Sequence, residues 1–160
     1  NPDFRRLFIN HSAVMLDYYL TYQRLAEATD LMTSTIPESE MARDMQKYPR
    51  YEHSFDMTGA TLKSYASTRT ARVRNEYRTE FGLGEDIVVT IASQGIGDVL
   101  LDGMKLPNKN YTGNFFAGNP MLLTAVPAEG RVFAGWLDGN TENPRPVLPE
   151  NGDSFVAVFK

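Results

Sequence analysis

The distribution of glycine along this chain of 160 residues constrains the fold more than any other feature. Only one of the 12 glycines, Gly59, lies in residues 1–80, and the other 11 lie in residues 81–160. Glycine destabilises the interior of a helix and is frequent in tight turns. We therefore expect a helical first half and a second half of short strands, with the change of class at Phe81–Gly84.

The first half is expected to form three or four helices. Thr21 is placed to cap the second helix, and Thr35–Glu38 has the form of a capping box for a short third helix, which Pro49 ends. The last helix is expected from about Met57 to Phe81, where Gly82 terminates it. Spacings of three and four residues give the first helix an apolar face made of Phe4, Leu7, Phe8, Val14, Met15, Tyr18 and Tyr19. A group of arginines on the last helix is expected to be solvated: Arg69, Arg72, Arg74 and Arg78.

The second half contains short apolar runs separated by Gly, Pro, Asn and Asp. The strand candidates are Ile87–Ile91, Val99–Leu101, Phe115–Phe116, Met121–Val126, Arg131–Trp136 and Phe155–Phe159, with turns at Asp102–Gly103 and Asp138–Gly139. Such short strands at regular intervals predict a small antiparallel sandwich or sheet. The expected fold class is therefore α+β, with a helical segment at residues 1–83 and a small antiparallel β domain at residues 84–160.

Composition narrows the classes of function. The chain has no cysteine, which excludes disulfide scaffolds, thiol catalysis and Cys-based zinc sites. The net charge of −4 gives no reason to expect nucleic acid as a partner, and no apolar run reaches the roughly 18 residues of a membrane span. The two histidines, His11 and His53, lie in different expected elements without ligand spacing, and no phosphate-binding or dinucleotide glycine pattern occurs. We therefore expect no metal site, no cofactor and no catalytic role for either histidine.

Two groups of apolar residues are candidate surfaces. Tyr111, Phe116 and Trp136 lie close together in a small β domain, where they form either a ligand or partner surface or part of the core. Phe4, Phe8 and Met15 form an apolar stripe on the first helix. If this stripe is exposed, we expect the chain to bury it by self-association, as a homodimer.

The helical half resembles the last helices of the CotH family, the spore-coat-type atypical kinases. Phe8–Asn10 leading to Leu16 is similar to that family's asparagine-bearing helix, and Pro37–Arg50 is similar to its Pro-Glu-Met…Arg segment. The most specific similarity is Leu62–Arg69 followed by Val73 and Phe81–Leu83.

The β half resembles divergent internalin B-repeats, small modules that follow such domains in secreted Bacteroidetes proteins. Tyr111–Gly113, Phe116, Leu123–Ala128, Gly130 and Phe133–Trp136 carry this similarity.

Together the two resemblances imply a non-catalytic accessory region of a secreted or cell-surface bacterial protein. In the CotH family the ATP-binding and metal-binding residues belong to the preceding domain, so the resemblance implies no enzyme activity for this chain. The helices would pack on that upstream domain, and the β module would bind a protein, cell-wall or glycan partner or act as a spacer. An extracellular, periplasmic or cell-surface location follows from the same resemblance. A carboxylate-based glycan hydrolase and a purely structural self-association module remain the alternatives.

Overall fold

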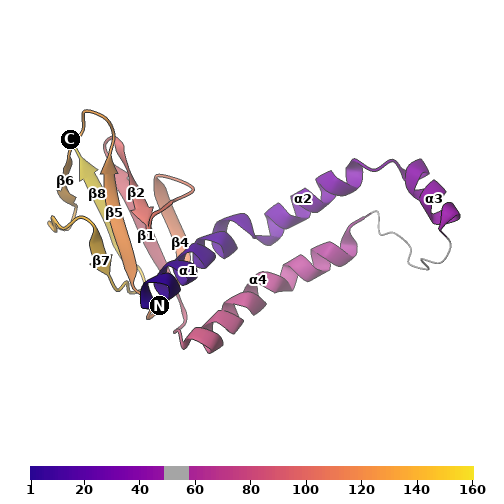
Figure 1. Cartoon of the computed structure of the whole chain (residues 1–160), viewed down its shortest axis with the longest axis horizontal. Helices are drawn as coiled ribbons and strands as arrows, with labels where there is room; N and C mark the ends of the chain where they lie inside the picture. Colours follow the sequence, from indigo (N-terminus) through magenta and orange to yellow (C-terminus); the bar gives the residue numbers. More distant parts are fainter. Residues whose placement is uncertain (49–57) are drawn as a thin grey trace. The chain divides into compact units, whose positions relative to one another are not determined.

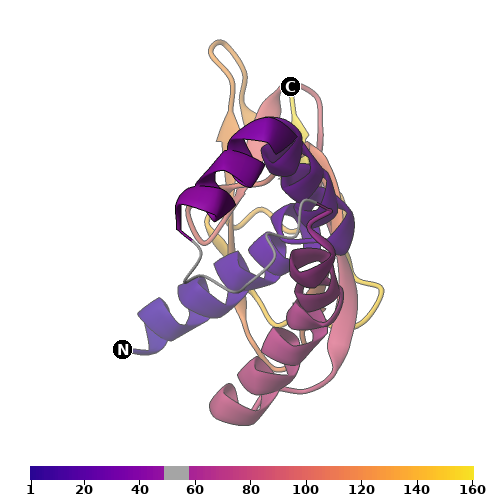
Figure 2. The ribbon, with the colours of Figure 1, turned by 90° about the vertical axis from the view of Figure 1, so that its right-hand side faces the viewer.

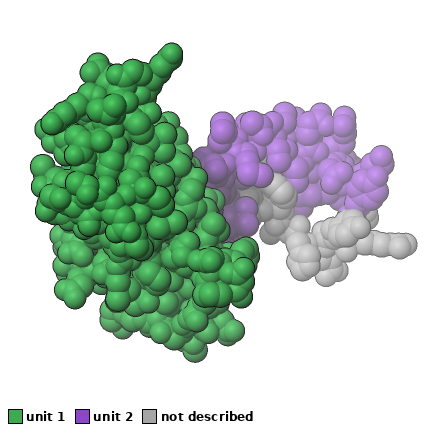
Figure 3. Space-filling view, turned by 60° about the vertical axis from the view of Figure 1, so that its left-hand side comes forward, with its two compact units in different colours: residues 1–19, 74–160 green, residues 20–73 purple. Residues whose placement is uncertain are grey.

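The computed structural model describes residues 1–48 and 58–160 (Figure 1). The third helix ends at Lys47 with Tyr48 as its C-cap, as expected from Pro49, whereas the expected start of the last helix at Met57 lies outside the described residues. The chain divides into two compact units, which Figure 3 shows in different colours. Unit 1 contains Asn1–Tyr19 and Arg74–Lys160, and unit 2 contains Leu20–Val73.

The helices of the first half form as expected. They are α1 (Pro2–Val14), α2 (Tyr22–Ser34), α3 (Glu38–Lys47) and α4 (Ala60–Phe81), and α1 continues into a π-helical turn, η1 (Met15–Tyr19). Thr21 caps α2, because its hydroxyl accepts a hydrogen bond from the Arg24 N–H at 3.4 Å. Gly82 follows α4 at φ +60°, the left-handed conformation that suits the end of a helix. The capping box expected at Thr35–Glu38 is wrong, because Thr35 ends α2 and its hydroxyl donates backwards to the Met32 carbonyl at 2.7 Å.

The second half forms two four-stranded sheets. The strands are β1 (Asp86–Gln94), β2 (Gly97–Leu101), β3 (Met104–Lys105), β4 (Asn110–Phe116), β5 (Met121–Pro127), β6 (Phe133–Trp136), β7 (Arg145–Val147) and β8 (Ser154–Phe159). One sheet has the order β4-β1-β8-β6, and the other has the order β3-β2-β5-β7. The second sheet is antiparallel, but the first is mixed because β1 and β8 pair in parallel. The α+β class is therefore confirmed, and the purely antiparallel arrangement is wrong in this one pair.

Helix α1 shares the core of the sheets. Ile9, Ala13 and Val14 have no exposed surface and belong to the same apolar cluster as Val89 and Leu123. Figure 1 and Figure 2 show α1 lying against the strands. Unit 1 thus combines α1, the end of α4 and the β strands.

Within unit 2, α2 and α4 run antiparallel. The Lys63 ammonium pairs with the Asp30 carboxylate, and the Thr70 hydroxyl donates to the Leu20 carbonyl at 2.9 Å. Gly59 permits the close approach of the two helices, because a Cβ at this position would overlap the methyl group of Thr29.

Candidate functional site: an aromatic groove on α1 and α4

A groove with a volume of about 560 Å³ opens on unit 1 beside the end of α4. Phe8 of α1 lines it together with residues of α4: Asn75, Glu76, Tyr77, Thr79, Glu80 and Phe81. We call this feature the aromatic groove.

The apolar wall of the groove is part of a stack of aromatic rings. The ring centroids of Phe4 and Phe8 are 6.0 Å apart, those of Phe8 and Tyr77 are 5.7 Å apart, and those of Tyr77 and Phe116 are 5.9 Å apart. All three pairs are nearly parallel, with interplanar angles of 12–18°. The stack therefore extends from the core of the sandwich, where Phe116 is buried, to the solvent at Phe4, which is 65% exposed.

The rim of the groove is polar and largely acidic. Glu76 and Glu80 are exposed, and neither forms an ion pair with any described residue. The Arg5 guanidinium donates to the Phe81 carbonyl and lies over the Phe81 ring, 5.6 Å from its centroid. An apolar wall beside free carboxylates suits an apolar side chain that is accompanied by a positive charge.

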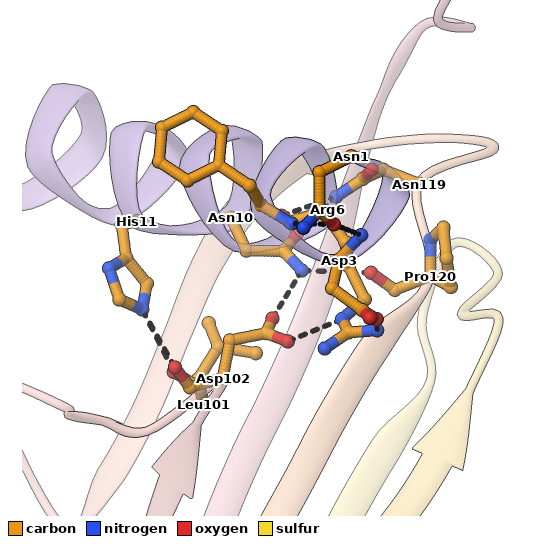
Figure 4. A network of polar contacts seen from close by, with 10 residues as sticks. Asn1, Asp3, Arg6, Asn10, His11, Leu101, Asp102, Asn119 and Pro120 are labelled. Carbon is orange, nitrogen blue, oxygen red and sulfur yellow. Dashed lines mark hydrogen bonds and ion pairs between the residues drawn. The ribbon is translucent and has the colours of Figure 1, made fainter.

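A buried polar network fixes α1 on the sandwich (Figure 4). The Asp102 carboxylate, in the turn between β2 and β3, accepts hydrogen bonds from Arg6 Nε and Asn10 Nδ2, both at 2.7 Å. Asn10 Nδ2 also donates to the Pro120 carbonyl at 2.8 Å, and the Asn10 amide oxygen accepts from Asn119 Nδ2 at 2.8 Å. Because each buried polar group has a partner, the network holds α1 in one register on the sheets.

A second ion-pair cluster fixes the end of α4. Arg74 Nε lies 2.8 Å from the Asp86 carboxylate, and Arg74 Nη2 donates to the Asn114 carbonyl at 2.8 Å. Arg78 Nη2 lies 2.8 Å from the other oxygen of Asp86. The solvated arginine face expected on α4 is therefore wrong for Arg74, which is buried because Asp86 at the start of β1 supplies its counter-charge.

The candidate surface on the β domain does not form. Tyr111, Phe116 and Trp136 are all buried, which corrects their interpretation as a ligand or partner surface. The polar atoms of the two amphipathic rings have internal partners, since the Tyr111 hydroxyl donates to Asp17 at 3.2 Å and Trp136 Nε1 donates to the Glu142 carbonyl at 2.8 Å. Burial raises the pKa of Tyr111, and the negative charge of Asp17 raises it further. These rings fill the small core instead.

The candidate surface on α1 is exposed. Phe4 is 65%, Phe8 39% and Met15 42% exposed. Phe4 and Phe8 belong to the aromatic stack, whereas Met15 does not line the groove. The sequence gives no signal that Tyr77 and Phe81 of α4 meet Phe8, because 69 residues separate Phe8 from Tyr77.

Other candidate chemistry can be located among the described residues. His11 Nε2 lies 3.2 Å from the carbonyls of Leu101 and Asp102, so this ring forms part of the contact between α1 and the β2–β3 turn. His53 lies outside the described residues. In the part of the chain that the structure describes, no three His, Asp or Glu side chains gather as metal ligands do. No helix there combines the length and apolar character needed to cross a membrane.

Comparisons with models of protein families, with curated proteins and with solved structures gave no match.

Proposed function

We propose that this chain is a non-catalytic protein-binding region, an accessory part of a secreted or cell-surface CotH-like bacterial protein. The observation that carries the proposal is the exposure of Phe4 and Phe8 on a helix that is fixed on the sandwich core. Aromatic side chains held rigidly at the surface supply large contact area at a low cost in conformational entropy, which is typical of protein-binding sites.

The ring geometry favours a protein over a glycan. A sugar ring stacks on the open face of an aromatic ring. Phe4, Phe8 and Tyr77 are nearly parallel with ring centroids 5.7–6.0 Å apart, so the rings form an offset series and none is an isolated flat platform. Ring edges and an apolar wall remain, and these suit the side chains of a protein partner.

The resemblance to CotH proteins supports the accessory role. The kinase residues of that family belong to the domain before these helices, and that domain is one candidate partner of the groove. No observation favours the carboxylate-based hydrolase, because the two glutamates that line the groove are exposed, whereas a carboxyl acting as general acid needs a buried environment.

The test is a binding measurement with two protein partners. The chain is immobilised and titrated with the upstream domain of its parent protein and, separately, with the chain itself. We expect one of them to bind and the variant Phe8→Ser to weaken that binding by about tenfold or more. The matched control is Val132→Ser, which changes another exposed apolar residue outside the groove.

Two results would contradict the proposal. One is binding to neither protein, or binding that Phe8→Ser and Val132→Ser change equally. The other is phosphoryl transfer or glycan hydrolysis by the isolated chain, which would make it an enzyme in its own right.

A further inference from the structure

The two glutamates on the rim of the aromatic groove lower the stability of α4. Glu76 and Glu80 both line the groove and lie four residues apart, which is one helical turn or about 6 Å along the axis. Like charges at this spacing repel each other. Glu80 also lies in the last turn of α4, where the negative end of the helix dipole disfavours a carboxylate. Residues that oppose local stability in this way are typical of functional sites.

Neither glutamate has a cation as its partner among the described residues. Arg78 lies in the same last turn but pairs with Asp86, at 2.8 Å. The Arg5 guanidinium donates to the Phe81 carbonyl instead of a carboxylate. The groove therefore keeps two negative charges beside its apolar wall, and a cation from another molecule would offset their repulsion.

Arg5 shows how a cation binds to the aromatic wall. Its guanidinium lies over the Phe81 ring, 5.6 Å from the ring centroid. A cation in this position is attracted to the negative face of the ring. Phe8 and Tyr77 line the groove together with Phe81, so the wall offers a partner both apolar contact and contact with a cation.

The groove is lined by residues of two antiparallel helices, which suits a third helix. The Tyr77 hydroxyl donates to the Ser12 hydroxyl at 3.0 Å, whereas Phe81 contacts Phe8, one turn earlier on α1. The contacts thus run in opposite directions along α1 and α4. An amphipathic helix binds to such a surface by laying its apolar side into the groove. Its residues i and i+4 are also about 6 Å apart, which is the spacing of the two glutamates along α4.

Charge disfavours a second copy of this chain as the occupant of the groove. The chain has a net charge of −4, so two copies repel each other. The exposed stripe of α1 carries Arg5 beside Phe4, but this arginine already binds Phe81 of its own chain. A basic helix of another protein has free cations to bring to the acidic rim, so charge complementarity selects it.

We propose that the aromatic groove binds a basic amphipathic helix of another protein. The apolar side of that helix packs against Phe8, Tyr77 and Phe81, and two Lys or Arg side chains, one turn apart, pair with Glu76 and Glu80. This inference rests on the proposed protein-binding function and specifies the chemistry of the partner.

The test is a titration of the full chain with two synthetic helices of about 18 residues, each followed by the fluorescence anisotropy of an attached dye. The basic helix carries leucines on one side and lysines at positions i and i+4 next to them. In the acidic helix, glutamate replaces every lysine. At low ionic strength we expect the chain to bind the basic helix about tenfold or more tightly than the acidic helix, and added salt should reduce this preference.

Charge reversal at the rim should exchange the preference. The double variant Glu76→Lys with Glu80→Lys is expected to weaken binding of the basic helix by about tenfold or more and to bind the acidic helix instead. Phe8→Ser should also weaken binding of the basic helix, because it removes part of the apolar wall. The matched control is Glu129→Lys with Glu142→Lys, which makes the same charge change at two exposed sites outside the groove and should keep the original preference.

Urea denaturation shows whether a variant is folded. Because the two rim glutamates are exposed and unpaired, their replacement by lysine should leave the chain at least as stable as before.

Three results would overturn the inference: equal binding of the two helices, no binding of the basic helix, or equal effects of charge reversal at the groove and at the control sites. If the upstream domain or a second copy nevertheless binds in a manner that depends on Phe8, the inference fails while the proposed function stands. If neither the basic helix nor either of these proteins binds in a manner that depends on Phe8, both fail.

Discussion

At the scale of single residues, Asp102 determines where α1 lies. Its side chain has no exposed surface, and its backbone has φ 48°, the left-handed conformation that Asp and Asn tolerate better than other residues with a side chain. A residue with this conformation in the β2–β3 turn directs a carboxylate at Arg6 and Asn10 of α1. Asp102 thus stabilises the β2–β3 turn and also anchors α1 on the sheets.

Replacing Asp102 with alanine should lower the free energy of unfolding by about 2–3 kcal/mol, because Arg6 and Asn10 lose their shared acceptor and Arg6 is only partly exposed. Asp102→Asn keeps the turn conformation and one acceptor, so its cost should be smaller. Urea denaturation measures both. Asp98→Asn, which removes an exposed pair with Lys105, should cost under about 1 kcal/mol. Equal costs at positions 98 and 102 would contradict the role of the network.

Tyr111 gives a prediction for alkaline pH. Its pKa is raised above the ordinary value of 10.0 by burial and by Asp17. Above pH 10 the unfolded chain loses this proton while the folded chain keeps it, so the free energy of unfolding should fall as the pH rises. Below pH 10 both states hold the proton, and this contribution to stability is fully present. Denaturation at several pH values should show a shallower fall for Tyr111→Phe, and an unchanged slope would contradict the assignment.

At the scale of elements, the sequence predicts most of the helices and strands because local chemistry determines them. The glycine at position 82 ends α4, and Asp102–Gly103 forms the β2–β3 turn. The parallel pairing of β1 with β8 was not predictable, because it joins residues such as Ile91 and Phe155 that are remote in the sequence.

Of the buried face of α1, the sequence predicted only Val14, for a physical reason. A search for large apolar residues selects Phe4 and Phe8, but the face against the sheets consists of Ile9, Asn10, Ala13 and Val14. Small side chains let a helix approach a sheet closely, and the buried Asn10 is accommodated only because Asp102 and Asn119 bind it. The candidate site was therefore half predicted: Phe4 and Phe8 were found as an exposed stripe, whereas their meeting with Tyr77 and Phe81 depends on the tertiary fold.

The packing of α1 predicts a contrast between two substitutions on the same helix. Ile9→Ala removes a fully buried side chain from the core shared with the sheets and should cost about 3 kcal/mol. Phe4→Ala removes a side chain that is 65% exposed and should cost under about 1 kcal/mol. Chemical denaturation followed by the fluorescence of Trp136 reports on the sandwich itself. Equal costs would mean that α1 is not part of this core.

The antiparallel contact of α2 and α4 depends on Gly59. Gly59→Ala imposes an unfavourable φ of +63° on alanine and also overlaps Thr29, so amide exchange in α2 should accelerate by about tenfold or more. Gly82→Ala is the matched control, because φ is +60° there and no atom lies near the added methyl group. If amide exchange in α2 accelerates equally in both variants, backbone strain alone causes the effect and the contact with Thr29 does not.

At the scale of the whole molecule, unit 2 is an insertion in the sequence of unit 1. The chain leaves unit 1 after Tyr19 and returns to it at Arg74. Within unit 2 the Thr70 hydroxyl donates to the Leu20 carbonyl, so the start and the end of this insertion lie close together. The apolar core of the sandwich and α1 contains only residues of unit 1. In contrast, α2 and α3 have no buried residue. The stability of the sandwich should therefore reside in unit 1.

This separation predicts the outcome of two deletions. Joining Tyr19 to Arg74 through a short Gly-Ser linker removes unit 2 and should leave the cooperative unfolding of the sandwich within about 1 kcal/mol of the full chain, because no core residue is lost. Residues 84–160 alone keep every strand but lose Ile9, Ala13 and Val14, and the uncovered apolar surface should prevent native folding or cause aggregation. Amide NMR spectra and unfolding curves of the two variants check these outcomes. A well-folded 84–160 fragment would show that the strands are an independent domain and that α1 is an addition to its surface.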